Sequence, residues 1–304
     1  MRRRVVVPLT LVAVASVLTA CDSDEPDGPA PRVIRPGDAY VALGDSYTAV
    51  PGTGPNATST GCNNTTVNYP HLVADELGLE LTDNSCDGAA TENLLDEQCV
   101  AACSAKDITF QKLRPPQVQG LDEDTRLVTF RLGANDYGLI GRIIGCASLS
   151  QAGTPGSPCA DQDAELGEDS MEPRLRDMER NVRRGIEEVQ DRAPDARIIV
   201  LGYPRIAPDE GTCHLLPLPD GDYEYARQIM LGINAALQAV ADEADLTFID
   251  MYAASEGHDV CSDDPWVAGW TPIGEPPPEG ARRLHPYAAA AEAEAELVLE
   301  ALKP

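Results

Sequence analysis

The sequence has few basic residues and few histidines. Its 304 residues include 23 lysines and arginines against 50 aspartates and glutamates, which gives a formal net charge of −27. A surface this acidic repels nucleic acids and anionic lipid headgroups, so we expect neither as a partner. There are only four histidines, and the nine cysteines form no paired Cys-x-x-Cys motifs. Both shortages argue against a zinc site, and we expect no metal.

Long apolar runs are missing after the first twenty residues, where nothing approaches the roughly 20 apolar residues of a membrane-spanning helix. The chain begins with Met1-Arg2-Arg3-Arg4 and continues with the apolar stretch 5–18, a pattern typical of a signal peptide. Leu18-Thr19-Ala20-Cys21 then resembles a bacterial lipobox. We therefore expect residues 1–20 to be a lipoprotein signal peptide and Cys21 to carry the lipid. The alternative is ordinary cleavage near Ala20, which leaves Cys21 free and the protein secreted.

The segment after the signal peptide is rich in proline and aspartate and has no periodicity. We expect residues 21–37 to form a disordered tether. The remaining residues, 38–304, have the length of a single α/β domain with loop insertions, and they contain no internal repeat. We expect this domain to be a monomer.

Five short apolar runs predict β-strands, at Ala39–Leu43, Leu79–Asp83, Arg126–Leu132, Ala196–Gly202 and Leu246–Asp250. Apolar residues that recur every three or four positions predict two helices between the last three strands; they are Leu175, Met178, Val182, Ile186 and Val189, then Ala226, Ile229, Met230, Ile233, Leu237 and Val240. Strands separated by helices pair in parallel, and ligands bind at their carboxyl ends. The segments 147–170, 204–222 and 253–284 do not fit this scheme. We expect the first, which is polar and contains glycine and proline, to flank the cleft, and the other two to be long loops that shape substrate specificity.

Polar motifs follow the first three predicted strands. Gly44-Asp45-Ser46 ends the first, Gly88 lies in the turn after the second, and Gly133-Ala134-Asn135-Asp136 ends the third. A serine at a strand-to-helix turn presents its hydroxyl outward, although this motif is not the Gly-x-Ser-x-Gly elbow of α/β-hydrolases. Taken singly, Ser46 could be a helix cap, Gly88 a left-handed turn residue and Asn135 an Asx-turn.

Taken together, these motifs line up a hydroxyl, backbone N–H groups and an amide along one edge of a sheet. Donors fixed around a developing oxyanion are often the largest catalytic contribution in acyl transfer. A serine nucleophile also needs a base, and histidine titrates near neutral pH. His285, just before Pro286 and an alanine-rich helix, is the best candidate. We expect other roles for the remaining histidines, which are His71 in a helical pattern, His214 in a loop and His258 beside Asp259.

At Gly44-Asp45-Ser46, Gly88, Gly133-Ala134-Asn135-Asp136 and His285-Pro286 the sequence resembles the SGNH, or GDSL, family of serine hydrolases. The resemblance extends over residues 38–303, and the segment 258–266 is similar to that of secreted actinobacterial esterases and lipases. It implies a flavodoxin-like, three-layer α/β/α fold with a five-stranded parallel sheet and ester hydrolysis without a cofactor. It also implies an oxyanion hole made by Ser46, Gly88 and Asn135.

The sequence departs from the family pattern three residues before the histidine, where most members have an aspartate and this chain has Arg282. Some actinobacterial relatives are understood to use a main-chain carbonyl there. We therefore expect the carbonyl of Arg282, or of a nearby residue, to accept the Nδ1–H of His285 and orient the ring. The alternative is a carboxylate that folds back, from Asp250, Asp259, Asp263 or Asp264.

The cysteine count fits an exported protein. With Cys21 set aside, eight cysteines remain, an even number that suits disulfides in an oxidising compartment. The family resemblance suggests three pairs and leaves a fourth; they are Cys62–Cys86, Cys146–Cys159, Cys213–Cys261 and Cys99–Cys103.

These features predict an extracytoplasmic carboxylic ester hydrolase of the lipase or esterase type. Ser46 would attack the acyl carbonyl with His285 as base, and water would then release the acid from the acyl-enzyme. We expect a small-molecule or lipid ester as substrate and contact with the membrane only through the lipid on Cys21. Two alternatives stay open: a carbohydrate O-acetyl esterase, and a lipoprotein on the same scaffold that binds a ligand without catalysis.

Overall fold

The computed structural model describes residues 33–104, 111–151, 155–270 and 280–303. The predicted signal peptide, Cys21 and most of the predicted tether lie outside these residues. The described chain contains a five-stranded parallel sheet in the order β2-β1-β5-β6-β7. Its strands are β1 Ala39–Gly44, β2 Glu80–Asp83, β5 Thr125–Arg131, β6 Arg197–Leu201 and β7 Thr247–Ile249. All five predicted strands are confirmed, and no end is shifted by more than one residue.

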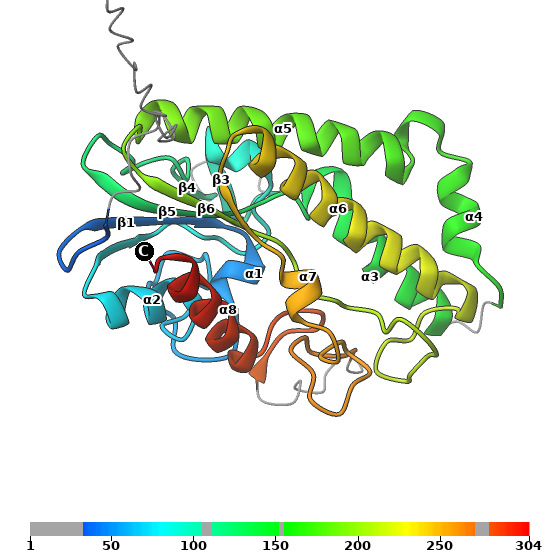
Figure 1. The fold of residues 1–304 in the computed structure, drawn as a ribbon. Coiled ribbons are helices and arrows are strands. Elements are labelled where there is room, and N and C mark those ends of the chain that lie inside the picture. The colour runs from blue at the N-terminus through cyan, green and yellow to red at the C-terminus, as the bar shows by residue number, and fades with distance from the viewer. Residues whose placement is uncertain (1–32, 105–110, 152–154, 271–279, 304) are drawn as a thin grey trace, which may run out of the picture. The chain divides into compact units, whose positions relative to one another are not determined.

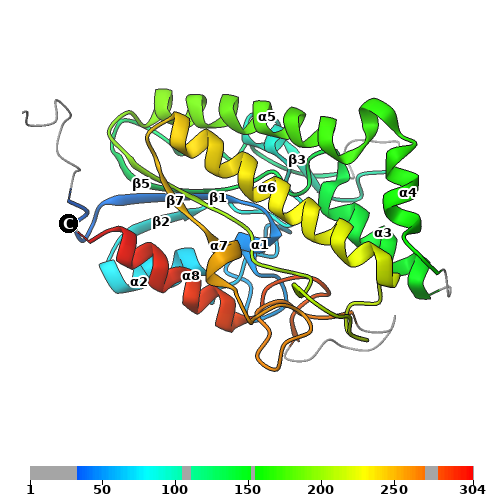
Figure 2. The same ribbon diagram turned by 45° about the vertical axis from the view of Figure 1, so that its right-hand side comes forward.

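Helices cover both faces of the sheet and complete three layers (Figures 1 and 2). One face carries α3 Leu139–Gln151, α5 Met171–Arg192 and α6 Tyr223–Glu243, and the other carries α2 Tyr69–Leu77 and α8 Ala288–Ala301. Strand side chains alternate between the two layers, as the period of a strand requires. Val41, Leu43, Val128 and Phe130 belong to the first core, and Tyr40, Ala42, Leu127 and Ile199 to the second.

The two predicted apolar stripes form the inner faces of α5 and α6. Met178, Val182, Ile186 and Val189 of α5 are buried, as are Ala226, Ile229, Met230, Ile233, Leu237 and Val240 of α6. Amphipathic helices of this length are fixed mainly by burial of one face, so periodicity alone was sufficient to find them. These side chains are core residues, and Met178 and Val182 lie close to Gly133 at the start of the third motif.

The segment 147–170, which the sequence assigned to no strand or helix, is largely helical in its described residues. It holds the end of α3, the helix α4 Pro158–Ala164 and the short turn η4 Gly167–Asp169. The buried Asp222 accepts hydrogen bonds from the backbone N–H groups of Cys159 (3.1 Å) and Ala160 (2.9 Å) and so caps α4. This capping residue lies 63 positions away in sequence, so no local pattern could show it.

The remaining elements are short. They are the helices α1 Ser46–Ala49 and α7 Met251–Ala254, the turns η1 Thr91–Leu94, η3 Asp136–Gly138 and η5 Asp220–Asp222, and an antiparallel pair of strands, β3 Gln98–Ala101 and β4 Lys112–Arg114. The predicted loops 204–222 and 253–284 are irregular over most of their described residues. No helix in the described ranges has both the length and the apolar character needed to cross a bilayer.

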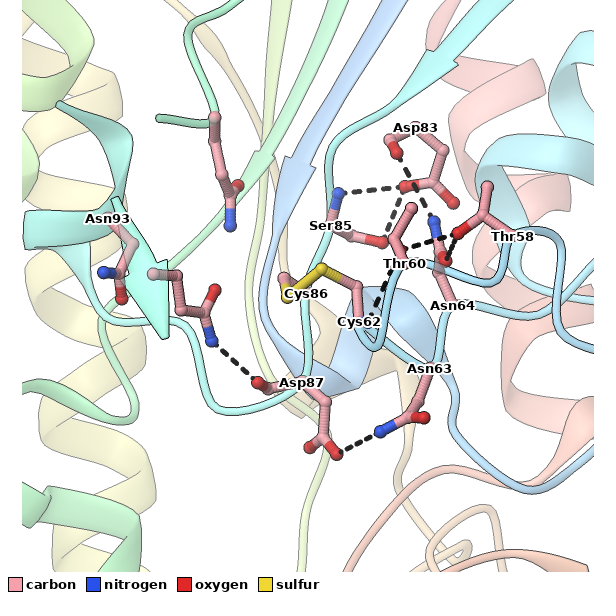
Figure 3. Close-up of a disulfide and its surroundings, with 12 residues drawn as sticks. Thr58, Thr60, Cys62, Asn63, Asn64, Asp83, Ser85, Cys86, Asp87 and Asn93 are labelled. Atoms are coloured by element: carbon pink, nitrogen blue, oxygen red, sulfur yellow. Dashed lines mark hydrogen bonds between the residues drawn. A yellow bond between two sulfur atoms is a disulfide. The ribbon is translucent and has the colours of Figure 1, made fainter. Parts of the chain in front are cut away.

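Four disulfides join the eight cysteines in the pairs that the family resemblance suggested, and this prediction is confirmed. Cys62–Cys86 fastens the loop after α1 to the turn after β2 (Figure 3). Cys146–Cys159 joins α3 to α4, Cys213–Cys261 joins the two long loops, and Cys99–Cys103 closes a small loop. Cys62–Cys86 and Cys213–Cys261 therefore brace loops that follow the carboxyl ends of strands.

Candidate active site

The first part of the site is the sharp turn from β1 into α1. Asp45 is the N-cap of α1, and its carboxylate accepts a hydrogen bond of 2.8 Å from the backbone N–H of Tyr47. The capping role considered for Ser46 therefore belongs to Asp45, and Ser46 begins the helix. Gly44 has to be a glycine here, because a Cβ would lie 2.3 Å from Oγ1 of Thr48. The turn thus leaves the Ser46 hydroxyl at the carboxyl end of β1.

The second part is the turn after β2, where Gly88 adopts a left-handed conformation with φ +75°. The N–H of Cys86 donates to the carbonyl of Gly44 (3.0 Å), and the N–H of Asp87 donates to the carbonyl of Cys62 (2.9 Å). The Cys62–Cys86 disulfide joins the same turn to the loop that follows α1 (Figure 3). The Gly88 turn is consequently held against both β1 and the loop that follows α1.

The third part follows β5. The side-chain amide of Asn135 donates a hydrogen bond of 2.9 Å to the carbonyl of Ala89, the neighbour of Gly88. Asp136 accepts a bond of 2.8 Å from the backbone N–H of Thr91 and a second bond from its hydroxyl. These contacts bring the second and third motifs together, with the Asn135 amide next to the Gly88 turn.

His285 lies in the loop before α8, and Tyr47 connects it to the first motif. The Tyr47 hydroxyl donates a hydrogen bond of 2.6 Å to the carbonyl of Leu284. The Tyr47 ring also stacks on the imidazole, with the ring centroids 5.9 Å apart and the planes 27° from parallel. Because Tyr47 follows Ser46 and Leu284 precedes His285, the predicted nucleophile and base lie in the same part of the molecule.

The group that orients His285 is the carbonyl of Arg283, not that of Arg282. Nδ1 of His285 lies 2.7 Å from the Arg283 carbonyl oxygen. The Arg282 carbonyl instead accepts the backbone N–H of His285 at 3.1 Å and closes the turn. A carbonyl can only accept, so Nδ1 carries the proton and Nε2 of the neutral ring is left with a free lone pair.

The Arg282 side chain has a different partner, since its guanidinium forms an ion pair with Asp87, next to Gly88. Asp87 also accepts a hydrogen bond of 3.1 Å from the Asn63 side chain (Figure 3). Where most of the family has an acid before the histidine, this chain has a cation that pairs with an acid on the Gly88 turn. The two residues are 195 positions apart, which hid the pairing from sequence analysis.

The four carboxylates considered as alternatives are placed elsewhere. Asp250 caps α7 through the N–H of Ala253, and Asp259 accepts the N–H of Cys261. The Asp264 carboxylate lies 3.5 Å from Nδ1 of His258, and Asp263 is exposed.

The other three histidines have the structural or surface positions that were expected. His71 lies in α2 and is hydrogen-bonded to Asn68, the N-cap of that helix. His258 stacks on Trp266 with ring centroids 4.3 Å apart, and His214 is exposed.

Comparison with known proteins agrees with this geometry. The model of the GDSL-like lipase/acylhydrolase family matches residues 42–293, which cover all four motifs. The chain belongs to this family. "Lipase 2" of Streptomyces coelicolor is 34% identical over 256 residues, which cover 82% of each chain. The chain is thus a GDSL-like hydrolase of carboxylic esters, and both the family and the enzyme class inferred from the motifs are confirmed.

Solved structures support the same assignment of the fold. The crystal structure of phospholipase A1 from Streptomyces albidoflavus is 25% identical, with a TM-score of 0.69 over 87% of this chain and 99% of that one. The crystal structure of an extracellular lipase from Streptomyces rimosus is 24% identical, with a TM-score of 0.67 over 87% of this chain and 100% of that one. The predicted α/β fold with its five-stranded parallel sheet is confirmed for this GDSL-like hydrolase.

The electrostatics of the GDSL-like site favour a neutral base. Burial lowers the pKa of His285, while the hydrogen bond to the Arg283 carbonyl and the charge of Asp87 raise it and the charge of Arg282 lowers it again. The net shift is downward, so the imidazole is unprotonated at neutral pH and able to accept a proton.

Asp45, Arg131 and Glu294 of this hydrolase form a second set of polar residues, buried behind the turn that carries Ser46, and sequence analysis gave them no role. Asp45 is fully buried, and burial raises its pKa to about 6 against the hydrogen bonds from Tyr203 and Tyr47. Arg131 and Glu294 are also fully buried and form an ion pair of 2.9 Å. The available signals were a charged residue at the end of an apolar strand and another inside an alanine-rich helix.

One group of possible metal ligands exists among the described residues, formed by Cys146, Cys159 and Asp222. The two sulfurs are joined in a disulfide, and the carboxylate accepts two backbone N–H groups of α4. A disulfide lacks the thiolates that bind zinc, so this cluster has a structural role.

Proposed function

We propose that this protein is an exported serine hydrolase that cleaves acyl esters, lipid esters first among them, through an acyl-enzyme on Ser46. The observation that supports this most directly is the double contact of Tyr47 with the His285 loop, through a hydrogen bond of 2.6 Å to Leu284 and a ring stack on the imidazole. It brings the region of the serine and the region of the base together from opposite ends of the sequence.

In the first half of the reaction, Nε2 of His285 takes the proton of the Ser46 hydroxyl as Oγ attacks the acyl carbonyl carbon. The carbonyl oxygen becomes an oxyanion and accepts hydrogen bonds from the N–H of Ser46, the N–H of Gly88 and the amide of Asn135. When the tetrahedral intermediate collapses, the carbon–oxygen bond to the alcohol breaks. His285 returns its proton to the leaving oxygen.

In the second half, His285 takes a proton from water, and the resulting hydroxide attacks the acyl-enzyme carbonyl. The same donors stabilise the second oxyanion, and collapse gives the carboxylic acid while the proton returns to Oγ of Ser46. The Arg283 carbonyl keeps the ring in the tautomer that these steps require. Asp87 supplies negative charge at longer range while the imidazolium exists, which partly replaces the carboxylate of a triad.

Export and lipid substrates are supported by separate observations. The motif Leu18-Thr19-Ala20-Cys21 fits attachment of a lipid at Cys21, and four disulfides suit an oxidising compartment. Relatives are named as a lipase and a phospholipase A1, which favours acyl chains of lipids over acetyl groups. We infer a protein outside the cytoplasm that is held at the membrane by its N-terminal lipid or released.

The test is turnover of p-nitrophenyl esters of short and long acyl chains, and of phosphatidylcholine, by the wild type and by Ser46→Ala. We expect Ser46→Ala to lose at least about 10⁴-fold in kcat while keeping its fold by circular dichroism. Ser148→Ala, an exposed serine of α3, is the matched control and keeps wild-type activity.

Three results contradict parts of the proposal. An inert wild type indicates a binding lipoprotein. Hydrolysis of acetylated carbohydrate alone indicates an O-acetyl esterase. Wild-type activity in Ser46→Ala removes the proposed nucleophile.

A further inference from the structure

An ion pair lies in the interior of the protein between the sheet and α8. Nη1 of Arg131, the last residue of β5, is 2.9 Å from Oε1 of Glu294, and both side chains are 0% exposed. Removing two charges from water is costly, so a buried ion pair is weak evidence of stabilisation. Its position suggests another role, because Arg131 precedes the third motif and Glu294 lies in the helix that follows His285.

The guanidinium of Arg131 reaches the residue next to Ser46. In α1 the N–H of Val50 donates to the carbonyl of Ser46 at 2.9 Å, so the next donor, to the carbonyl of Tyr47, would come from residue 51. Residue 51 is a proline and has no N–H. Nη1 of Arg131 donates to the Tyr47 carbonyl instead, at 3.0 Å. A buried cation thus replaces the missing helical donor.

The opposite side of the same residue is held by a buried anion. The Asp45 carboxylate accepts the N–H of Tyr47 at 2.8 Å and the hydroxyl of Tyr203 at 2.6 Å. The Tyr203 hydroxyl in turn accepts the N–H of Ala134 at 3.3 Å, one residue before Asn135. Both backbone groups of Tyr47 are therefore fixed by charged side chains, and the network extends to the third motif.

A helix of four residues cannot hold this geometry alone. The first turn of a helix is unfavourable without tertiary contacts, and α1 is a single turn. This turn carries the Ser46 hydroxyl and the Ser46 N–H, whose positions relative to the reacting carbonyl decide the rate. A contact that fixes α1 without touching the substrate can therefore change kcat.

We propose that Arg131, paired with Glu294, is a positioning residue for the turn that carries Ser46, and that the buried pair serves hydrolysis and not stability. The proposal rests on the nucleophilic role proposed for Ser46. Glu294 extends the effect to the base, since α8 begins three residues after His285 and the same ion pair joins that helix to the nucleophile turn.

The test replaces both charges by apolar side chains in the full-length mature chain, as Arg131→Met/Glu294→Met. Apolar replacement of a buried pair is often neutral or stabilising, while the loss of Nη1 leaves the Tyr47 carbonyl without its donor, so we expect the double variant to fold with a free energy of unfolding close to that of the wild type. We expect kcat to fall by about 10- to 100-fold with a smaller change in KM, because the turn is misplaced while the substrate contacts remain. The control is Arg142→Met/Asp163→Leu, which removes a largely buried pair between α3 and α4 and keeps wild-type kcat.

Each result decides the matter. Wild-type kcat in the double variant overturns the positioning role, and loss of folding overturns the claim that the pair is not needed for stability. If the double variant does not fold, Arg131→Lys, which keeps a cation beside Glu294 and removes the guanidinium that donates to the Tyr47 carbonyl, tests positioning alone. Lower kcat at unchanged KM supports it, and wild-type kcat overturns it. A fully active Ser46→Ala removes the proposed function itself, which is a separate result.

Discussion

Two ion pairs flank the candidate site, and they differ in almost every physical respect. Arg131–Glu294 lies under the nucleophile turn with both side chains 0% exposed. Arg282–Asp87 lies between the His285 loop and the Gly88 turn with exposed fractions of 47% and 20%. Removing one partner of a buried pair is strongly destabilising, whereas a half-exposed pair is screened by water and contributes little to stability. The first can therefore fix positions, and the second can adjust the charge near the base.

The largest difference is expected when each arginine is removed alone. Arg131→Ala leaves Glu294 buried without a partner, which costs about 3 to 5 kcal/mol of the free energy of unfolding. Arg282→Ala leaves Asp87 partly in water and costs about 1 kcal/mol or less. Urea unfolding of the two variants measures both values. Equal losses would mean that the burial of the two pairs does not differ as described.

The next effect concerns the pH dependence of stability. Burial raises the pKa of Glu294 from 4.5 to about 6, against the opposing effect of Arg131. A carboxyl group with a raised pKa in the folded state binds its proton more tightly there, so it contributes stability below pH 4.5 that is lost as the pH rises through about 6. The contribution is about 2 kcal/mol at most.

The variant Glu294→Gln should remove this contribution. We expect its free energy of unfolding to depend less steeply on pH between 4.5 and 6 than that of the wild type. Unfolding in urea across this range provides the measurement. Glu292→Gln, at an exposed position of the same helix, is the control; a Glu294→Gln curve parallel to the wild type would contradict the shift.

A smaller effect is expected from Tyr47, which connects the regions of the two pairs. Tyr47→Phe removes the hydrogen bond to the carbonyl of Leu284, which is 1% exposed, and keeps the ring on the imidazole. Loss of one such bond costs about 1 kcal/mol, which corresponds to roughly a fivefold decrease in kcat/KM if the His285 loop shifts. Tyr225→Phe, which removes the hydroxyl of a buried tyrosine near α4, serves as the control. An unchanged rate would show that the loop is held by other contacts.

The sequence predicted the parts of this site that local patterns determine. The apolar runs before Ser46, Gly88 and Asn135 are long enough to define three strands, and parallel pairing then brings their ends to one edge. His285 was identified by elimination among four histidines.

What the sequence could not predict depends on contacts between distant residues. Arg131 and Glu294 are far apart in the chain, and in isolation each contradicts the apolar pattern around it. Asp87 and Arg282 meet only because two turns meet. The choice of Arg283 over Arg282 depends on the direction in which the turn points each carbonyl, and a shift of one residue is beyond what spacing can resolve.

The smallest expected effect is a change in the pH profile from the exposed pair. Asp87 raises the pKa of His285 and Arg282 lowers it. The acid limb of kcat/KM reports the pKa of the base in the free enzyme, because only the neutral imidazole accepts the serine proton. Arg282→Gln removes the positive charge, so the limb should move to higher pH. Asp87→Asn removes the negative charge, so the limb should move to lower pH.

The two variants should move the acid limb in opposite directions, whereas a loss of stability would lower the rate in both without moving the limb in either. The test is therefore independent of folding. Arg227→Gln, which breaks the Arg227–Glu224 pair on α6, is the control for charge removed away from the site and should leave the limb in place. Shifts in the same direction would mean that the pair acts on the loop and not on the charge of His285. Disruption of Arg131–Glu294 should lower kcat without moving this limb, so the same titration separates a pair that positions the serine from a pair that adjusts the base.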